Sequence, residues 1–210
     1  MKISASILGM KDDFEEHVKK LSETDIDYIH LDIMDGIFVK EKTWTKENIC
    51  FTKYLNKPLD VHLMVKDVYS YIDAFSLLNP EFITFHYEAS NDVDSVIDYI
   101  KTKNTKIGIS INPDTKVENL LPYLKYIDLV LVMSVIPGKG GQIFQNKSIN
   151  KIKELKEIKK QNKYKYLIEI DGGINDQNIK STGADIAVVG SFITESTNYQ
   201  NQIDKLRKNS

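Results

Sequence analysis

Short apolar segments rich in β-branched and aromatic residues recur along the chain, and polar segments with helical periodicity lie between them. The expected strands are residues 3–7, 28–34, 59–65, 82–87, 106–111, 129–135, 166–170 and 186–190. The expected helices are residues 12–23, 68–78, 93–103, 117–124, 148–160, 176–181 and 202–208. In the first helix, Phe14, Val18 and Leu21 have the spacing of one helical face, and Asp12 and Asp13 suit its N-terminus.

Several apolar segments are too continuous for burial on one face, which is typical of strands covered on both faces in a parallel sheet. Strands alternate with helices, and no linker rich in Pro, Gly or Ser interrupts them. This order predicts an α/β fold with a single (β/α)₈ TIM barrel domain over residues 1–210. A doubly wound open sheet is the alternative, because periodicity does not distinguish an open sheet from a closed one. In a barrel, functional side chains gather where the strands end.

Three expected strands carry side chains suited to metal binding. His30 and Asp32 lie two residues apart and therefore face one side of a strand, His62 lies in the next strand, and Asp171 closes the seventh. Two imidazoles and two carboxylates are a donor set for a divalent cation, and the carboxylates can also transfer protons. A structural polar network is the alternative. The cost of burying carboxylates without a partner or cation favours the metal site.

Glycines cluster in three segments that follow expected strands. Gly138, Gly140 and Gly141 flank Lys139 in a loop that suits an anion cradle or a mobile lid, and a flexible connection is the alternative. Two further segments, 172–173 and 190–191, follow the last two strands, where barrels commonly bind phosphate. Backbone N–H groups at such glycines can approach an anion closely.

Other notable residues have simpler interpretations. His86 is typical of a core histidine, His17 of an exposed helix position, and Asp35 of a turn or cap before a glycine. Cys50 is expected to be a buried thiol on a helix. Three methionines either fill the core or form a polarizable wall at the barrel mouth: Met34, Met64 and Met133.

Composition and charge limit the classes of molecule that the protein is expected to bind. A net charge of -2 provides no field able to hold nucleic acid or an anionic membrane, so we expect a small-molecule partner. A single cysteine excludes an internal disulfide and suits a reducing cytosol. The apolar run at the N-terminus is too short for a signal peptide, and no segment approaches the ~20 apolar residues of a spanning helix. We therefore expect a cytoplasmic protein.

The chain resembles the ribulose-phosphate 3-epimerase family over nearly its full length, and several motifs in the right order are more specific than any one of them. These motifs are residues 4–8, 30–36, 59–64, 111–113, 129–135, 137–142, 169–174 and 189–191. The departures are local. Ile37, Lys40 and Glu41 stand where the family usually has His, Pro and Asn, Ala5 replaces a proline, and Ile136 replaces an asparagine.

The resemblance implies an isomerase that interconverts D-ribulose 5-phosphate and D-xylulose 5-phosphate by epimerisation at carbon 3 through an ene-diolate. It implies one divalent metal ion, Zn²⁺, Fe²⁺, Mn²⁺ or Co²⁺, bound by His30, Asp32, His62 and Asp171, with Asp32 and Asp171 as the acid and base. It favours the methionine wall and a homo-oligomeric assembly. The implied contacts to the sugar phosphate are Ser6, His62, Gly138, Lys139, Gly140, Gly141, Asp171, Gly172, Gly173, Gly190 and Ser191.

Three rival functions are open to a barrel of this kind. An epimerase acting on D-allulose 6-phosphate resembles the chain closely but tends to have serine in place of Gly173. The relatives of orotidine phosphate decarboxylase use an Asp-x-Lys signature, whereas this chain has Asp32-Ile33-Met34. A non-catalytic sugar-phosphate sensor is expected to lose one of the two acids, and both are present.

Overall fold

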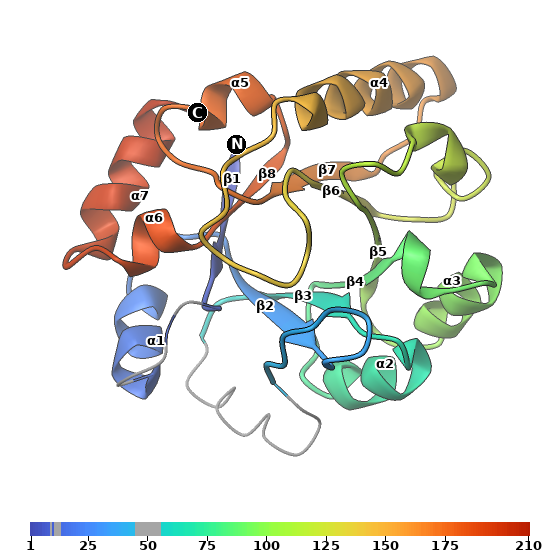
Figure 1. The fold of residues 1–210 in the computed structure, drawn as a ribbon, viewed down its shortest axis with the longest axis horizontal. Coiled ribbons are helices and arrows are strands. Elements are labelled where there is room, and N and C mark those ends of the chain that lie inside the picture. Colours follow the sequence, from blue (N-terminus) through green and yellow to red (C-terminus); the bar gives the residue numbers. More distant parts are fainter. Residues whose placement is uncertain (9, 11–13, 45–55) are drawn as a thin grey trace.

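The eight strands of the chain close into a parallel barrel (Figure 1). The computed structural model describes residues 1–8, 10, 14–44 and 56–210. Each strand pairs with its neighbours in sequence order, and β8 pairs with β1. This closure confirms the (β/α)₈ prediction over the open sheet. The strands are β1 (Lys2–Ser6), β2 (Tyr28–Met34), β3 (Leu59–Met64), β4 (Phe82–His86), β5 (Lys106–Ile111), β6 (Leu129–Met133), β7 (Leu167–Asp171) and β8 (Ile186–Val189).

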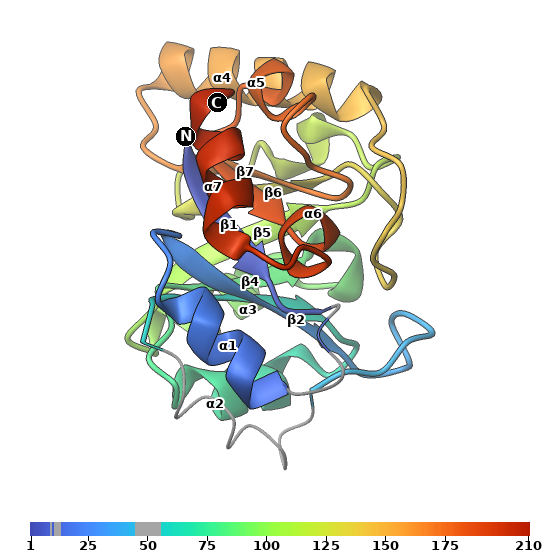
Figure 2. The same ribbon diagram turned by 90° about the vertical axis from the view of Figure 1, so that its left-hand side faces the viewer.

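Helices surround the strands on the outside (Figures 1 and 2). They are α1 (Phe14–Ser22), α2 (Val68–Ser76), α3 (Val93–Lys101), α4 (Lys147–Asn162), α5 (Ile179–Thr182), α6 (Ser191–Thr194) and α7 (Tyr199–Lys208). Two 3₁₀ turns, Tyr87–Ala89 and Val117–Leu120, follow β4 and β5. None of the described helices combines the length and apolar character needed to cross a membrane.

Two differences from the expected elements have clear physical reasons. The helix expected over residues 117–124 forms only the 3₁₀ turn Val117–Leu120, because Pro122 has no N–H and its ring clashes with the preceding turn of an α-helix. The helix α6 was not expected, since its four residues are too few to show a period. The expected helix start at Asp12 and the thiol of Cys50 lie outside the described residues.

The two faces of each strand have different roles. On β2, Ile29, Leu31 and Ile33 belong to the main apolar core, which includes apolar residues of the helices. Tyr28 lies on the opposite face and packs inside the barrel with three residues of alternate strands, the four-residue layer typical of this fold: Phe82, Leu129 and Ile186. His30 and Asp32 share the face of Tyr28, so the strand period directs them into the barrel interior.

Candidate active site

Strand register brings the predicted metal-binding residues together. Asp32 of β2 lies beside His62 of β3, and Met133 of β6 lies beside Asp171 of β7. One donor atom from each of His30, Asp32, His62 and Asp171 lies within 4.8 Å of the others. The histidines are fully buried and Asp32 is nearly so. Four donors from three strands therefore converge on one point inside the barrel.

The two imidazoles surround one carboxylate oxygen. Asp32 Oδ1 lies 3.1 Å from His62 Nδ1 and 3.3 Å from His30 Nε2. Within the described residues, His30 Nε2 is buried without a hydrogen-bond partner, while Nδ1 of the same ring lies 2.6 Å from Asp60 Oδ2. Burial lowers the pKa of His30, but the charges of Asp60 and Asp32 outweigh it and raise the pKa well above its ordinary value. The position therefore favours positive charge, and its donors fit a divalent cation.

The environments of the two candidate proton carriers shift their pKa values in opposite directions. Burial and the neighbouring charge of Asp32 raise the pKa of Asp171 to about 7. Burial also raises the pKa of Asp32, but the charge and hydrogen bond of His30 outweigh it and lower the pKa well below the ordinary range. Such divergent pairs are typical of acid–base sites.

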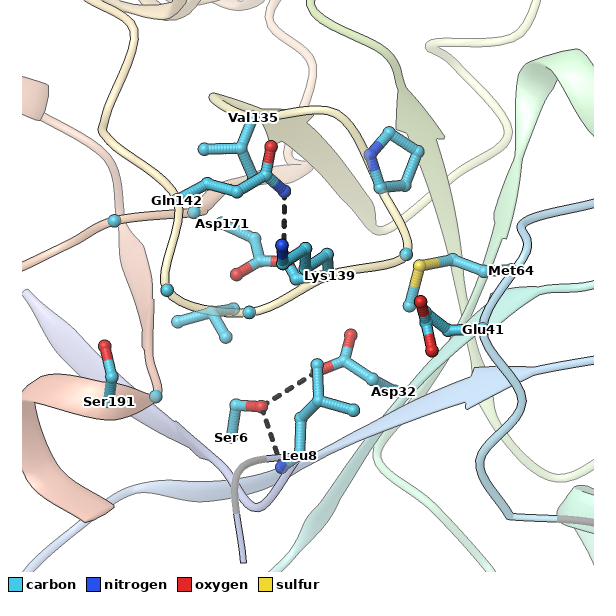
Figure 3. A pocket seen from close by; sticks show the side chains of 18 of the residues that line it. Ser6, Leu8, Asp32, Glu41, Met64, Val135, Lys139, Gln142, Asp171 and Ser191 are labelled. Carbon is cyan, nitrogen blue, oxygen red and sulfur yellow. Dashed lines mark hydrogen bonds between the residues drawn. The ribbon is translucent and has the colours of Figure 1, made fainter. Parts of the chain in front are cut away.

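A cavity of about 640 Å³ opens above these groups at the C-terminal ends of the strands. Figure 3 shows Asp32 and Asp171 entering it from different strands, with Ser6 Oγ donating to Asp32 Oδ2 at 2.8 Å. His30 and His62 are not among the residues that line the cavity, and both are fully buried. Its lining includes every expected substrate contact except His62, together with the three methionines: Ser6, Met34, Met64, Met133, Gly138, Lys139, Gly140, Gly141, Asp171, Gly172, Gly173, Gly190 and Ser191.

The loop after β6 is braced across one side of the cavity. Gln142 Nε2 donates to the carbonyl oxygens of Ile136 at 2.7 Å and Lys139 at 2.8 Å, which closes the loop on itself. Gly138 has a φ of +105°, and a Cβ there would lie only 2.8 Å from Cβ of Val39. Figure 2 shows the loops after β2 and β6 on the same side of the barrel. Gly138 is therefore packed against the loop after β2, while Lys139, Gly140 and Gly141 are exposed.

The structure also resolves two residues with simpler expected roles. Asp35 Oδ1 accepts hydrogen bonds from the backbone of Ile37 at 2.8 Å and Phe38 at 2.9 Å, which confirms its turn role. The prediction for His17 is wrong, because His17 is half-buried and its Nδ1 contacts the hydroxyl of Tyr199. That contact joins α1 to α7 from opposite ends of the chain, and a single helix pattern contains no information on such a neighbour.

The sequence interpretation did not identify two buried carboxylates behind the site, those of Asp60 and Glu169. Asp60 accepts a hydrogen bond from Ser4 Oγ at 2.8 Å as well as facing His30. Glu169 is fully buried, and its carboxylate has no hydrogen-bond partner in the described part of the chain. Burial and the charge of Asp60 raise its pKa well above the ordinary value. A signal was available, because Asp60 and Glu169 each precede a predicted ligand by two residues on the same strand face.

The fourth histidine of the chain, His86, is close to these groups. Its Nε2 lies 2.8 Å from His62 Nε2, and its Nδ1 lies 3.2 Å from Glu88 Oε2. Burial lowers the pKa of His86 to about 4, so the imidazole is neutral. The prediction that His86 is a core histidine is confirmed by its burial. It did not include the contact with His62, a predicted metal ligand.

Comparison with known proteins agrees with this geometry. The model of the ribulose-phosphate 3-epimerase family matches residues 2–194. The chain is 37% identical over 214 residues to the ribulose-phosphate 3-epimerase of Helicobacter pylori strain J99, covering 99% of this chain and 97% of that protein. It is 34% identical over 197 residues to the Escherichia coli K12 protein of the same name, covering 91% and 88%.

Solved structures show the same fold at low identity. The 3-hexulose-6-phosphate synthase of Salmonella typhimurium superposes with a TM-score of 0.69 at 16% identity, covering 99% of this chain and 97% of that one. At this identity the similarity shows only that the two proteins share the barrel fold. The family is shown by the family model and the sequence relatives. By its full-length match and its closed barrel, the chain belongs to the ribulose-phosphate 3-epimerase family.

Proposed function

We propose that this chain interconverts D-ribulose 5-phosphate and D-xylulose 5-phosphate by moving the proton on carbon 3 from one face of the substrate to the other. The observation that carries the proposal is the pair of carboxylates, Asp32 on β2 and Asp171 on β7, which face one cavity from different strands. One carboxylate removes the proton from carbon 3 while the other, protonated, returns a proton to the opposite face. The reverse reaction exchanges the two roles.

His30, Asp32, His62 and Asp171 would hold a divalent cation, since their donor atoms lie within 4.8 Å of one another. When bound, the cation supplies positive charge that stabilises the ene-diolate developing on the substrate. Mixed nitrogen and oxygen donors suit Zn²⁺, Fe²⁺, Mn²⁺ and Co²⁺ and do not select one of them. Ser6 donates to Asp32 and so orients the carboxylate toward the cavity.

The phosphate is proposed to bind where the last two strands end. Gly172 and Gly173 follow β7, and Gly190 and Ser191 lead into the short helix α6. Barrels commonly place phosphate at these loops and at the N-terminus of a short extra helix. The remaining contacts are assigned to Ser6 and the loop residues Gly138, Lys139, Gly140 and Gly141, which line the cavity. His62 is fully buried and does not line it, so we assign this residue to the cation site.

Gly173 is relevant to the choice between a pentulose and a hexulose phosphate. Its φ is +63°, and a Cβ there would lie 2.6 Å from both the Gln142 carbonyl oxygen and the Phe144 nitrogen. The backbone after β6 is thus packed against a residue without a side chain. A serine, typical of the D-allulose 6-phosphate epimerases, requires that segment to move, so the present geometry favours the pentulose.

The proposal is tested by assaying ribulose 5-phosphate and allulose 6-phosphate in parallel in heavy water. We expect faster turnover of the pentulose, with deuterium entering at carbon 3 because cavity-facing carboxylates exchange with solvent. Mass spectrometry and NMR of the product locate the label. Preferred turnover of the hexulose would contradict the substrate assignment, product without label would contradict the two-carboxylate transfer, and no turnover with tight sugar-phosphate binding would indicate a sensor.

Changing Gly190 to valine tests the phosphate site. A Cβ at this position makes ordinary contact, 3.7 Å from Ser6 Cβ, and the methyl groups beyond it would take space in the cavity. We expect KM for the phosphorylated sugar to rise while metal content stays intact. Lys139→Ala is the comparison variant, because an exposed lysine on the loop is expected to cost clearly less. Loss of metal in Gly190→Val, or an unchanged KM, would place the phosphate elsewhere.

A further inference from the structure

A continuous set of polar contacts leads away from His62 on the side opposite to Asp32. His62 Nδ1 faces Asp32 Oδ1 at 3.1 Å, and His62 Nε2 faces His86 Nε2 at 2.8 Å. His86 Nδ1 then faces Glu88 Oε2 at 3.2 Å. Both imidazoles are fully buried, so water does not supply alternative partners. Each of the four nitrogens in the two rings therefore faces one defined atom.

The contact between the two Nε2 atoms has room for one hydrogen, because two N–H groups directed at each other across 2.8 Å would clash. Either His62 donates to His86, or His86 donates to His62. In the second case His86 Nδ1 carries no hydrogen and places a lone pair against the carboxylate of Glu88, which is repulsive. In the first case His86 Nδ1–H donates to Glu88, and the His62 Nδ1 lone pair faces Asp32 Oδ1, a contact that is favourable only when a cation lies against both atoms. The charge on Glu88 therefore favours the first direction when a cation is held by His62 and Asp32.

Glu88 is held in place as an anion. Its Oε1 accepts hydrogen bonds from the backbone N–H of Asn112 at 2.8 Å and from the hydroxyl of Thr115. Burial raises the pKa of Glu88, but the hydrogen bonds of His86, Thr115 and Asn112 outweigh it and lower the pKa to about 2. Lys151 of α4 donates to the backbone oxygen of Asn112 at 2.7 Å and adds positive charge nearby. Glu88, the last residue in this series of contacts, is therefore an ionised acceptor held in place at neutral pH.

We propose that His86 is a positioning residue that keeps the hydrogen of His62 on Nε2 and so presents the Nδ1 lone pair to the cation shared with Asp32. The inference rests on the metal site proposed above. Ligand histidines generally donate their second N–H to such a partner, which fixes both tautomer and ring orientation. Here the partner is a second imidazole whose own direction is set by a carboxylate on the adjoining 3₁₀ turn.

Packing alone is the competing explanation for His86. Its ring stacks on His62 with centroids 4.9 Å apart and lies 5.0 Å from the ring of Phe38. His86→Phe keeps an aromatic ring in this space but removes the acceptor. His86→Gln loses the ring but places a carbonyl oxygen near the position of Nε2, where it can accept from His62. Comparing the two variants therefore separates the effect of ring packing from the effect of the hydrogen bond.

The experiment titrates the full chain, freed of metal by a chelator, with Co²⁺ and follows binding by calorimetry and by the visible spectrum of the ion. His86→Phe is expected to weaken Co²⁺ binding by about 10- to 100-fold, the usual effect of losing such a partner. His86→Gln is expected to recover most of that loss. His17→Gln removes an imidazole far from the site, against Tyr199, and is expected to leave the affinity unchanged. Thermal unfolding of each metal-free variant records the structural effect separately.

A second measurement shows directly which ring nitrogen of His62 carries the hydrogen. In the Zn²⁺-loaded wild type, the ¹⁵N spectrum of His62 is expected to show the hydrogen on Nε2. Unchanged Co²⁺ affinity in His86→Phe, failure of Gln to recover affinity despite a folded variant, or a hydrogen on Nδ1 of His62 would each overturn the positioning role. Absence of Co²⁺ and Zn²⁺ binding by the wild type would instead overturn the proposed metal site, so the two failures are distinguishable.

Discussion

Replacing Asp171 or Asp32 by asparagine is expected to lower turnover by at least about 10²-fold, the low end of the effect of a general acid or base. Asparagine preserves the size of the side chain and one oxygen, but it cannot accept or return the proton on carbon 3. Both residues enter the cavity, Asp171 from β7 and Asp32 from β2, so each loss interrupts transfer on one side of the substrate. Initial rates with ribulose 5-phosphate and, separately, with xylulose 5-phosphate measure the effect in the two directions.

Each of these changes also removes a candidate metal ligand, so metal content must be measured on the same samples. Rates are compared at saturating metal, where weakened binding no longer limits turnover. Asp204→Asn on the exposed face of α7 is the matched control, since it makes the same chemical change away from the cavity. Near-normal turnover in a variant would exclude the replaced aspartate as a proton carrier.

Removing the divalent cation is expected to lower turnover by about 10³-fold, because charge stabilisation by a metal is worth several kcal/mol and each 1.36 kcal/mol is a factor of ten in rate. The cation would balance the charge of the carboxylates among the four donors, and the buried His30 Nε2 has no hydrogen-bond partner among the described residues. The measurement is activity after dialysis against a chelator and after re-addition of Zn²⁺, Fe²⁺, Mn²⁺ or Co²⁺.

The same samples provide the control. A ligand that binds only the folded state raises the midpoint of thermal unfolding, so re-addition is expected to raise the melting temperature together with the activity. The His30→Ala variant, which lacks one of the two nitrogen donors, is expected to show a smaller rise in melting temperature. Full activity after chelation, with metal content verified as absent, would contradict a catalytic role for the cation.

The strand faces could be predicted from the sequence because they depend only on residues that are close together in the chain. The side-chain period of a strand is two, so His30 and Asp32 had to share a face before any fold was known. Helix ends and short helices were less readable. The four residues of α6 are too few for a period, and the segment after β5 has apolar spacing that Pro122 overrides.

The sequence by itself determined the alternating order of strands and helices, and the strand faces that carry the two histidines and two aspartates, because these depend on local period and on the cost of burying charge. Only the tertiary structure showed that the sheet closes into a barrel. The tertiary structure decided which atoms meet. Strand register set Asp32 beside His62, and barrel closure set Asp60 and Glu169 behind the ligands and His86 against His62. These contacts join residues far apart in the chain, and no local pattern encodes the distance between two strands.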